Sequence, residues 1–254
     1  MIKIAIIGSG KVASHLVEKV LSAPDLFSVE VYARHPEKLK EKFSNLHVVS
    51  HAKELTLADL YLLAISDDSI EEVSHSLPLK NQLVVHMAGS RPIDILSSSN
   101  RKGVMYPIQS FSNNKPMDFE KLIFCVEAEN EADYELLEQV VKALSSNSLR
   151  MNSEQRLTLH LSAVLVNNFV NHLYYLASEL CSKANIPFEL LQPLILETTQ
   201  KIQKMTPYEA QTGPAVRNDA QVITNHVSAL TNPDLAKIYQ LLTESIQKTY
   251  GKKL

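Results

Sequence analysis

The sequence has little of what would point to a disulfide-bonded or metal-binding protein. It has two cysteines and no tryptophan among 254 residues. Cys125 and Cys181 lie far apart without a C-x-x-C spacing, so neither a disulfide framework nor a zinc cluster is indicated. We expect both to be buried apolar side chains. His47 and His51 are four residues apart, but no third ligand accompanies them, so we predict no metal site.

Strong charge of one sign and long hydrophobic runs are also missing. The formal net charge is −3, which gives no broad basic field for nucleic acid or anionic lipid. No run approaches the roughly 18 apolar residues of a membrane span, and the first apolar run ends at a glycine turn without a signal-peptide cleavage site. We therefore expect a cytoplasmic protein with a small-molecule substrate and with neither a nucleic acid nor a membrane partner.

Glycine is scarce as well, and two of the six glycines follow the first predicted strand. Residues 3–7 read as a central parallel strand that is covered on both faces. Gly8 allows a tight turn, Gly10 lets backbone N–H groups approach a pyrophosphate, and Ala13 lets helix and strand pack closely. The helix that follows would direct its positive N-terminus at the phosphates. Glycine turns also join strands to helices for structural reasons alone. We predict that the dinucleotide contacts the turn residues Gly8, Ser9, Gly10, Lys11 and Val12.

The end of the second predicted strand indicates which dinucleotide binds. In NAD-binding folds an acidic residue about twenty positions beyond the glycine turn holds the ribose 2′-OH. The strand over residues 27–33 has Ala33 there, and Arg34 and His35 follow, with Lys38 one turn further on. A guanidinium can hold a 2′-phosphate through charge-assisted hydrogen bonds, so the sequence favours NADP over NAD. The alternative is that Arg34 is a solvated residue at a strand end.

The alternation of strands and helices continues along the first half of the chain. We expect strands over residues 58–65, 81–89, 103–111 and 121–128, and helices over 69–76 and 131–146. Ligands bind at the carboxyl ends of such strands. This places Ser66, Asp67 and His86, together with residues 106–110, near cofactor or substrate. His86 can equally be a hydrogen-bonded core histidine.

The character of the sequence changes near residue 150, and strand signals nearly vanish afterwards. Because 254 residues can form two ordinary domains, we predict a Rossmann domain over residues 1–150 and an all-helical substrate and dimerisation domain over residues 151–254. The first helix covers residues 153–184, with Asn152 as N-cap and Gln155 completing a capping box. Further helices are expected over residues 188–204, 214–230 and 233–250. The fold class is therefore a doubly wound α/β domain followed by an all-α domain.

The long helix carries polar residues that packing does not require. His160 and Asn167 are seven apart, and Asn168 and Asn171 adjoin them, so several polar groups project within a limited arc. This strip could face the cleft between the domains and bind substrate. The alternatives are ordinary surface residues, or hydrogen bonds that fix the register between helices.

A second polar cluster follows Gly213 and Pro214. Arg217 and Asp219 are expected in the first turns of a helix, where the helix dipole does not favour arginine. Arg217 therefore either pairs with Asp219 or contacts an acidic ligand.

Six segments together resemble a known family: "GSGKVASHL", "ISDDSI", "HMAGS", "YPIQSF", "HLSAVLVNNF" and "TGPAVRNDAQVITNH". The sequence is similar over nearly its whole length to bacterial Rossmann-like proteins with a C-terminal helical domain of unknown function, often labelled NADP oxidoreductases. More distantly it resembles pyrroline-carboxylate reductases, prephenate dehydrogenases and β-hydroxyacid dehydrogenases. The resemblance implies a helical domain that closes the site and dimerises.

The sequence departs from these families at three points. Tyr106 stands where the family usually has histidine, and Leu159 stands where it has tyrosine. Ala163 and Val164 occupy the positions at which β-hydroxyacid dehydrogenases place a catalytic lysine. Their mechanism therefore does not transfer to this chain.

Our main hypothesis is an NADP-dependent oxidoreductase that moves a hydride between nicotinamide and a small polar substrate, with anionic compounds among the candidates. His160 and Asn168 are the predicted catalytic residues, His160 as acid/base. Asn167, Asn171, Arg217 and His86 are predicted to bind substrate. The alternative is a regulator or sensor that holds NADP without chemistry; hydride exchange with a deazaflavin is a third hypothesis. We also expect a homodimer formed through the helical domain.

Overall fold

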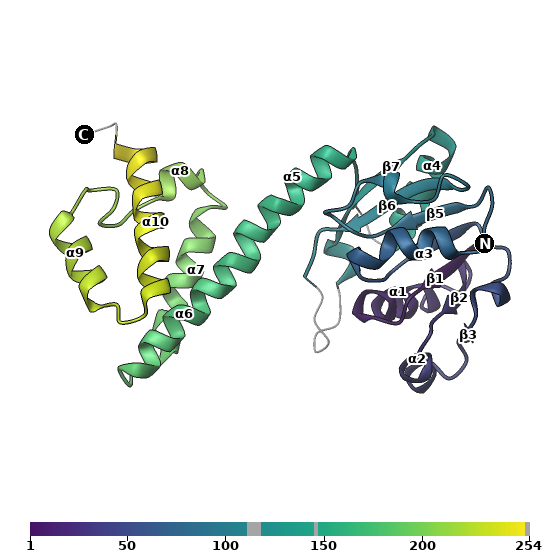
Figure 1. The fold of residues 1–254 in the computed structure, drawn as a ribbon, viewed down its shortest axis with the longest axis horizontal. Coiled ribbons are helices and arrows are strands. Elements are labelled where there is room, and N and C mark those ends of the chain that lie inside the picture. The colour runs from purple at the N-terminus through teal and green to yellow at the C-terminus, as the bar shows by residue number, and fades with distance from the viewer. Residues whose placement is uncertain (111–117, 145–146, 252–254) are drawn as a thin grey trace. The chain divides into compact units, whose positions relative to one another are not determined.

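The computed structural model describes residues 1–110, 118–144 and 147–251. Its N-terminal part is an eight-stranded sheet in the order β3-β2-β1-β4-β5-β6-β7-β8, with helices packed against it (Figure 1). The strand order reverses beside β1, which is where open α/β sheets bind ligands. The strands are β1 (Ile2–Ile7), β2 (Phe27–Tyr32), β3 (His47–Val49), β4 (Leu60–Leu63), β5 (Leu83–His86), β6 (Arg101–Pro107), β7 (Ile123–Ala128) and β8 (Asn147–Arg150).

The sheet is mostly parallel, which confirms the predicted doubly wound fold. Strands β1 to β6 pair in parallel, β7 runs antiparallel to β6, and β8 runs parallel to β7. Each predicted strand is present within a few residues of its expected ends, although Phe111 lies outside the described residues. Strand β8 was missed. It is an edge strand whose side chains are mostly exposed, so its sequence carries no apolar pattern.

Apolar clusters cover both faces of the sheet. Ile4 and Ile6 of β1 pack in one cluster with residues of α1 (Lys11–Leu21) and α4 (Glu131–Leu144). Ala5 and Ile7 pack in the other cluster with Ile70 of α3 (Ile70–Ser76). Successive side chains of a strand point to opposite faces, so burial on both faces explains the continuous apolar run that follows Lys3. Helix α2 (Glu37–Lys42) follows β2.

The predicted long helix begins as expected but is interrupted. The Asn152 side chain accepts a hydrogen bond from the Gln155 backbone N–H at 2.8 Å, and the Gln155 side chain accepts one from the Asn152 N–H at 3.1 Å. This confirms the capping box at the start of α5 (Ser153–Ala163). A π-helical segment (Val164–Phe169) then precedes α6 (Val170–Lys183). Because π-helical turns hold more residues than α-helical ones, the seven-residue spacing of His160 and Asn167 does not correspond to two α-helical turns.

The C-terminal part is helical, as predicted. It contains α6, a 3₁₀ turn (Phe188–Leu191), α7 (Gln192–Lys201), α8 (Pro207–Ala210), α9 (Ala220–Ala229) and α10 (Pro233–Tyr250). Asn232 caps α10 by accepting the backbone N–H groups of Asp234 and Leu235.

The helix predicted over residues 214–230 is shorter in the structure. Asn218 has a φ of 52°, which is outside the right-handed helical region, and Asp219 then caps α9 by accepting the Val222 N–H at 3.2 Å. Arg217 therefore lies in a turn ahead of the helix, not in its first turns.

The chain forms two compact units, Met1–Asn167 and Asn168–Leu254. The boundary lies within the π-helical segment, so α5 belongs to the first unit. The functional division at residue 150 stays a prediction. Cys125 is buried as expected, whereas Cys181 is partly exposed, so the expectation for Cys181 is wrong. Over the described ranges, no helix is long and apolar enough to span a membrane.

Candidate functional site

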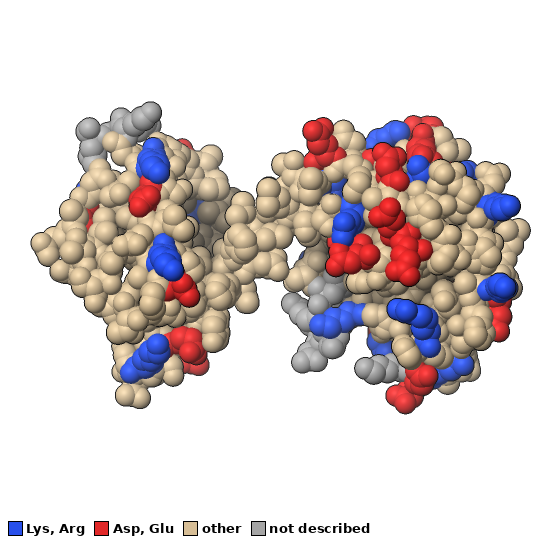
Figure 2. All heavy atoms as spheres, viewed as in Figure 1, with Lys and Arg blue, Asp and Glu red and all other residues tan. Residues whose placement is uncertain are grey.

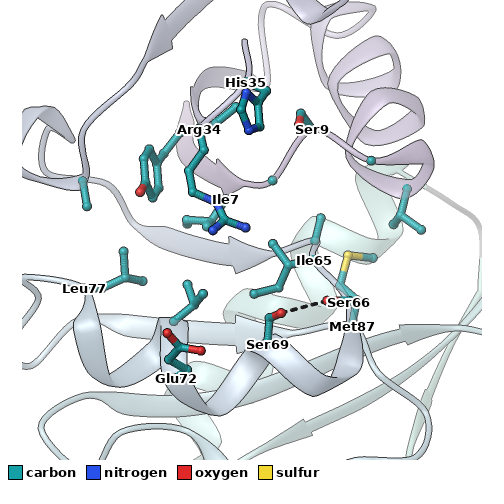
Figure 3. Close-up of a pocket in the computed structure, with 18 of the residues that line it drawn as sticks. Ile7, Ser9, Arg34, His35, Ile65, Ser66, Ser69, Glu72, Leu77 and Met87 are labelled. Atoms are coloured by element: carbon teal, nitrogen blue, oxygen red, sulfur yellow. Dashed lines mark hydrogen bonds between the residues drawn. The ribbon is translucent and has the colours of Figure 1, made fainter.

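A cavity of about 650 Å³ lies at the carboxyl ends of β1, β2 and β4 (Figure 3). It is the place where the reversal of strand order predicts a dinucleotide. All nine residues proposed to bind the cofactor line it, from the glycine turn, from the end of β2 and from the end of β4. They are Gly8, Ser9, Gly10, Lys11, Val12, Arg34, His35, Ser66 and Asp67.

The two positions of the turn favour glycine for different structural reasons. Gly8 has a φ of 127°, and a Cβ there would lie 2.3 Å from the carbonyl oxygen of Ala64. Only glycine tolerates both conditions. At Gly10 nothing lies within 4 Å of the position that a Cβ would take. Gly10 is the N-cap of α1, and no side chain of the described residues caps the first N–H groups of this helix. An open, uncapped helix N-terminus beside the cavity fits a pyrophosphate.

The far wall of the cavity was not predicted. Figure 3 shows Glu72 on α3, with Ser69 just ahead of this helix and Leu77 just after it, across the cavity from Arg34 and His35. The lining positions 69, 72, 73 and 76 follow helical spacing, so a face of α3 borders the cavity. This helical spacing is the sequence signal that could have predicted the wall. Arg34 is exposed and has no ion pair with any residue of 1–110, 118–144 or 147–251.

The loops after β4 and β5 are tied together at one end of the cavity. Ser90 Oγ donates a hydrogen bond to Asp67 Oδ2 at 2.8 Å, and the Arg91 guanidinium forms an ion pair with Asp68. Met87, at the start of the second loop, also lines the cavity. These contacts fix the residues that follow both strands relative to each other.

Beyond these loops, the end of β6 and the middle of α5 meet in a polar pair. The Tyr106 hydroxyl and His160 Nδ1 are 3.1 Å apart, and the rings meet edge to face at 73°. Gly89 packs against both rings, since a Cβ there would lie 2.7 Å from Tyr106 Cζ and from His160 Nδ1. Burial raises the pKa of Tyr106, and the nearby charges of Cys125 and Asp67 add to the effect. Sequence reasoning proposed His160 as acid/base and placed residues 106–110 near cofactor or substrate, but it assigned Tyr106 no chemical role.

Comparisons with known proteins identify the family. Residues 3–89 match the family "NADP oxidoreductase coenzyme F420-dependent", and residues 122–246 match "Domain of unknown function (DUF2520)". A solved structure of a "putative NADP oxidoreductase" from Bacteroides fragilis is 36% identical, with a TM-score of 0.85 and with 97% of this chain and 98% of that chain covered. The chain belongs to this family of two-part Rossmann proteins. The resemblance found in the sequence is thereby confirmed.

More distant structures share the fold of the family. A 1-pyrroline-5-carboxylate reductase from Streptococcus pyogenes is 16% identical, with a TM-score of 0.66 and 99% and 97% of the two chains covered. A semialdehyde dehydrogenase NAD-binding protein from Cupriavidus necator, solved with calcium and NAD, is 19% identical, with a TM-score of 0.65 and 98% and 99% covered. No curated protein matches the chain.

His86 lies in the interior of this family member, and its side chain is 0% exposed. Its Nδ1 accepts the Ala88 N–H at 3.1 Å, and Nε2 lies 3.3 Å from the Pro92 carbonyl, which places the ring proton on Nε2. Burial, with a further contribution from the charge of Arg156, lowers the pKa of His86 to about 3. The ring is therefore neutral and shapes the loop after β5. This geometry leaves no ring nitrogen free for the predicted contact with substrate.

Arg156 anchors α5, and with it His160, to the sheet. Its guanidinium forms an ion pair with Glu127 of β7 and donates to the Arg91 carbonyl at 2.6 Å. Ser153 joins this cluster by donating to Glu127 from both its backbone N–H and its hydroxyl. His160 lies about one helical turn beyond Arg156, so this cluster helps to position the His160 ring relative to the sheet.

The remaining predicted site residues lie in the π-helical segment (Asn167 and Asn168), in α6 (Asn171) and in the turn ahead of α9 (Arg217). Asn167 ends the first unit, whereas Asn168, Asn171 and Arg217 are exposed side chains of the second unit. No ion pair joins Arg217 to Asp219 in the described part of the chain. The predicted role of these four residues in binding substrate stays a prediction. The described residues contain no group of three potential metal ligands.

Proposed function

We propose that the protein is an NADP-dependent oxidoreductase. The proposal rests on the cavity. The uncapped N-terminus of α1 and the Arg34 side chain, which forms no ion pair with the described residues, both line it. When bound, the cofactor supplies or accepts a hydride at its nicotinamide ring. The family names and the named relative support a nicotinamide cofactor in general. The preference for NADP rests on Arg34 and His35, which directly follow Ala33 at the position where NAD-binding folds have a carboxylate.

The chain's own residues would position the cofactor and handle the proton. Backbone N–H groups of the turn after β1 bind the pyrophosphate, and Arg34 binds the 2′-phosphate. His160 is the proposed acid/base, while Asn168, with Asn167 or Asn171, orients a small polar substrate. Arg217 would hold an anionic group of that substrate.

Replacing Arg34 with alanine is expected to weaken NADPH binding about tenfold or more, because a charge-assisted hydrogen bond of about 1.5–3 kcal/mol is lost. NADH binding should change little, since NADH lacks the 2′-phosphate. Fluorescence titration of both nucleotides measures the two dissociation constants.

The matched control is Lys40→Ala, which removes an exposed cation of α2 that does not line the cavity. Equal losses of NADPH affinity in both variants would show a general charge effect and contradict the role of Arg34. If wild-type protein binds neither nucleotide, the turn after β1 is only structural and the proposed function is wrong.

We further propose that the helical unit forms a homodimer. Among its described residues only Ala215 and Thr243 are buried, so this unit has almost no core of its own. Figure 2 shows few charged side chains on its visible face apart from those over α10. A second copy would bring the same apolar side chains to a symmetric interface. The large apolar side chains exposed on this unit include Phe169, Leu173, Leu190, Leu194, Leu196 and Leu241.

The substitution Leu194→Arg tests this interface, because Leu194 is 63% exposed and an arginine there would have to be desolvated in the dimer. We expect dimer affinity to fall about tenfold or more, which is about 1.4 kcal/mol. Light scattering over a micromolar concentration series measures it. The control is Gln200→Arg, an exposed position of the same helix. A wild-type monomer throughout the series would end the proposal.

A further inference from the structure

Tyr106 lies against the loop after β5, whose first residue, Met87, lines the cavity, and the proposed function does not yet use its hydroxyl. Tyr106 is the next-to-last residue of β6, just before Pro107. Its side chain and that of His160 are both partly exposed. The hydroxyl and His160 Nδ1 are 3.1 Å apart, which is hydrogen-bond distance. Since Nδ1 is engaged by Tyr106, this nitrogen cannot donate directly to a substrate. The phenol hydroxyl can do so while it keeps the histidine as its partner.

The backbone around this pair is built to bring the two rings together. Gly89 leaves just enough room, because any larger residue would collide with the ring of Tyr106 and with that of His160. The same loop begins at Met87, which lines the cavity, and is held to Asp67 through Ser90. This loop therefore connects the pair to the end of the cavity at β4 and β5, which is opposite the end at β2.

The cavity has a direction that places the reacting end of a dinucleotide near this pair. Arg34 and His35 mark the end at β2, where the adenosine ribose would bind. A dinucleotide that crosses the glycine turn then directs its other half toward β4 and β5. The residues beyond β4 and β5 are the ones that connect the cavity to Tyr106.

We propose that Tyr106 is the group that donates a proton to the substrate, and that His160 returns a proton to Tyr106. This inference rests on the proposed function and deepens it. The substrate class is a small carbonyl or imine compound, since reduction of either needs one proton on oxygen or nitrogen.

A carbonyl substrate gains one hydride and one proton. The carbonyl carbon accepts a hydride from the reduced nicotinamide cofactor, and the oxygen uses the former π electrons to bond the proton of the Tyr106 hydroxyl. The phenolate oxygen then takes the Nδ1 proton of a protonated His160, and His160 regains a proton from water. A tyrosine hydroxyl with an ordinary pKa of about 10 is already protonated at neutral pH, as a donor must be, and burial raises the pKa of Tyr106 further.

The first experiment combines binding and turnover. NADPH oxidation is measured with a panel of small aldehydes, 2-oxo acids and cyclic imines. Tyr106→Phe is expected to lower kcat by about 10²–10⁴-fold while leaving the dissociation constant of NADPH unchanged. His160→Gln should also lower kcat, and the double variant should be no slower than Tyr106→Phe, because the two residues act as one unit. The control is Tyr134→Phe, on α4 and not among the residues that line the cavity.

Two kinds of result would contradict this inference. Binding of NADPH with no reduction of any panel member, or a Tyr106→Phe variant as fast as wild type, overturns this inference and leaves the proposed cofactor site intact. Failure of wild type to bind NADPH overturns the proposed function and this inference with it.

A second measurement does not depend on turnover. Carbon-13 labelling of tyrosine Cζ, with Tyr106→Phe to assign the resonance, reports the pKa of Tyr106 in each complex. The oxidised nicotinamide ring is positively charged and the reduced ring is not, so NADP⁺ should lower this pKa by about one unit or more relative to NADPH. An identical pKa in the two complexes would place Tyr106 away from the reacting ring and overturn the inference.

Discussion

Replacing Arg156 with alanine is expected to lower the free energy of unfolding by about 3–5 kcal/mol, the usual cost of removing one partner of a buried ion pair. The Arg156 side chain is 1% exposed and that of Glu127 is 14% exposed, so the orphaned carboxylate could not be fully rehydrated. The Arg91 carbonyl would lose its donor as well. Urea denaturation at neutral pH measures the loss.

The matched control is Arg150→Ala. Arg150 forms a two-point hydrogen-bonded ion pair with Glu131, but both side chains are more than half exposed. Its loss should cost no more than about 1 kcal/mol. Replacing both buried partners, Arg156→Met with Glu127→Gln, should cost less than Arg156→Ala, because no buried charge is then left alone. Equal losses of unfolding free energy for Arg156→Ala and Arg150→Ala would mean that the buried ion pair stabilises the fold no more than the exposed one.

Arg156 also links stability to the site. Together with Ser153 it joins α5 to the sheet and to the loop after β5, and it lies four positions before His160. A helix that loses this anchor would still be helical, since Asn152 caps it. It would not hold His160 against Tyr106 as firmly, because that hydrogen bond depends on where α5 meets the sheet.

The parts of the fold that depend on local sequence could be predicted. The apolar run of β1, the glycine turn and the capping box at Asn152 each involve residues within a few positions of one another. The common location of the residues proposed to bind the cofactor was also predictable, because parallel strands bring their carboxyl ends to one edge whatever the details of packing. All nine of them line the same cavity.

The parts that depend on distant residues could not be predicted. The Tyr106–His160 contact joins residues 54 positions apart, and it depends on the packing of Gly89 against both rings and on the anchoring of α5 by Arg156. The π-helical segment (Val164–Phe169) has no local signal, since its residues are compatible with an α-helix. Strand β8 is specified by its pairing with β7 rather than by its own pattern.

The strand residue His86 makes the protein sensitive to mild acid. Its pKa is lowered to about 3 by burial and by the charge of Arg156, against about 6.5 in an unfolded chain. Between these values the unfolded state binds a proton at His86 and the native state does not, so stability falls as the pH falls. From pH 7 to pH 5 the loss should be about 2 kcal/mol, and it should continue at about 1.4 kcal/mol per pH unit until the pH approaches 3.

The comparison that isolates this effect is the slope of unfolding free energy against pH in wild type and in His86→Gln. Glutamine does not titrate, and its amide does not replace His86 Nδ1 as acceptor for the Ala88 N–H, so the variant should be less stable at pH 7 and yet lose less stability between pH 7 and pH 5. Other histidines and the carboxylates titrate in both proteins, and their contributions cancel in the difference. Parallel slopes would show that His86 binds a proton in the folded protein as readily as in the unfolded chain. The buried ring would then not be the neutral group that its two backbone contacts indicate.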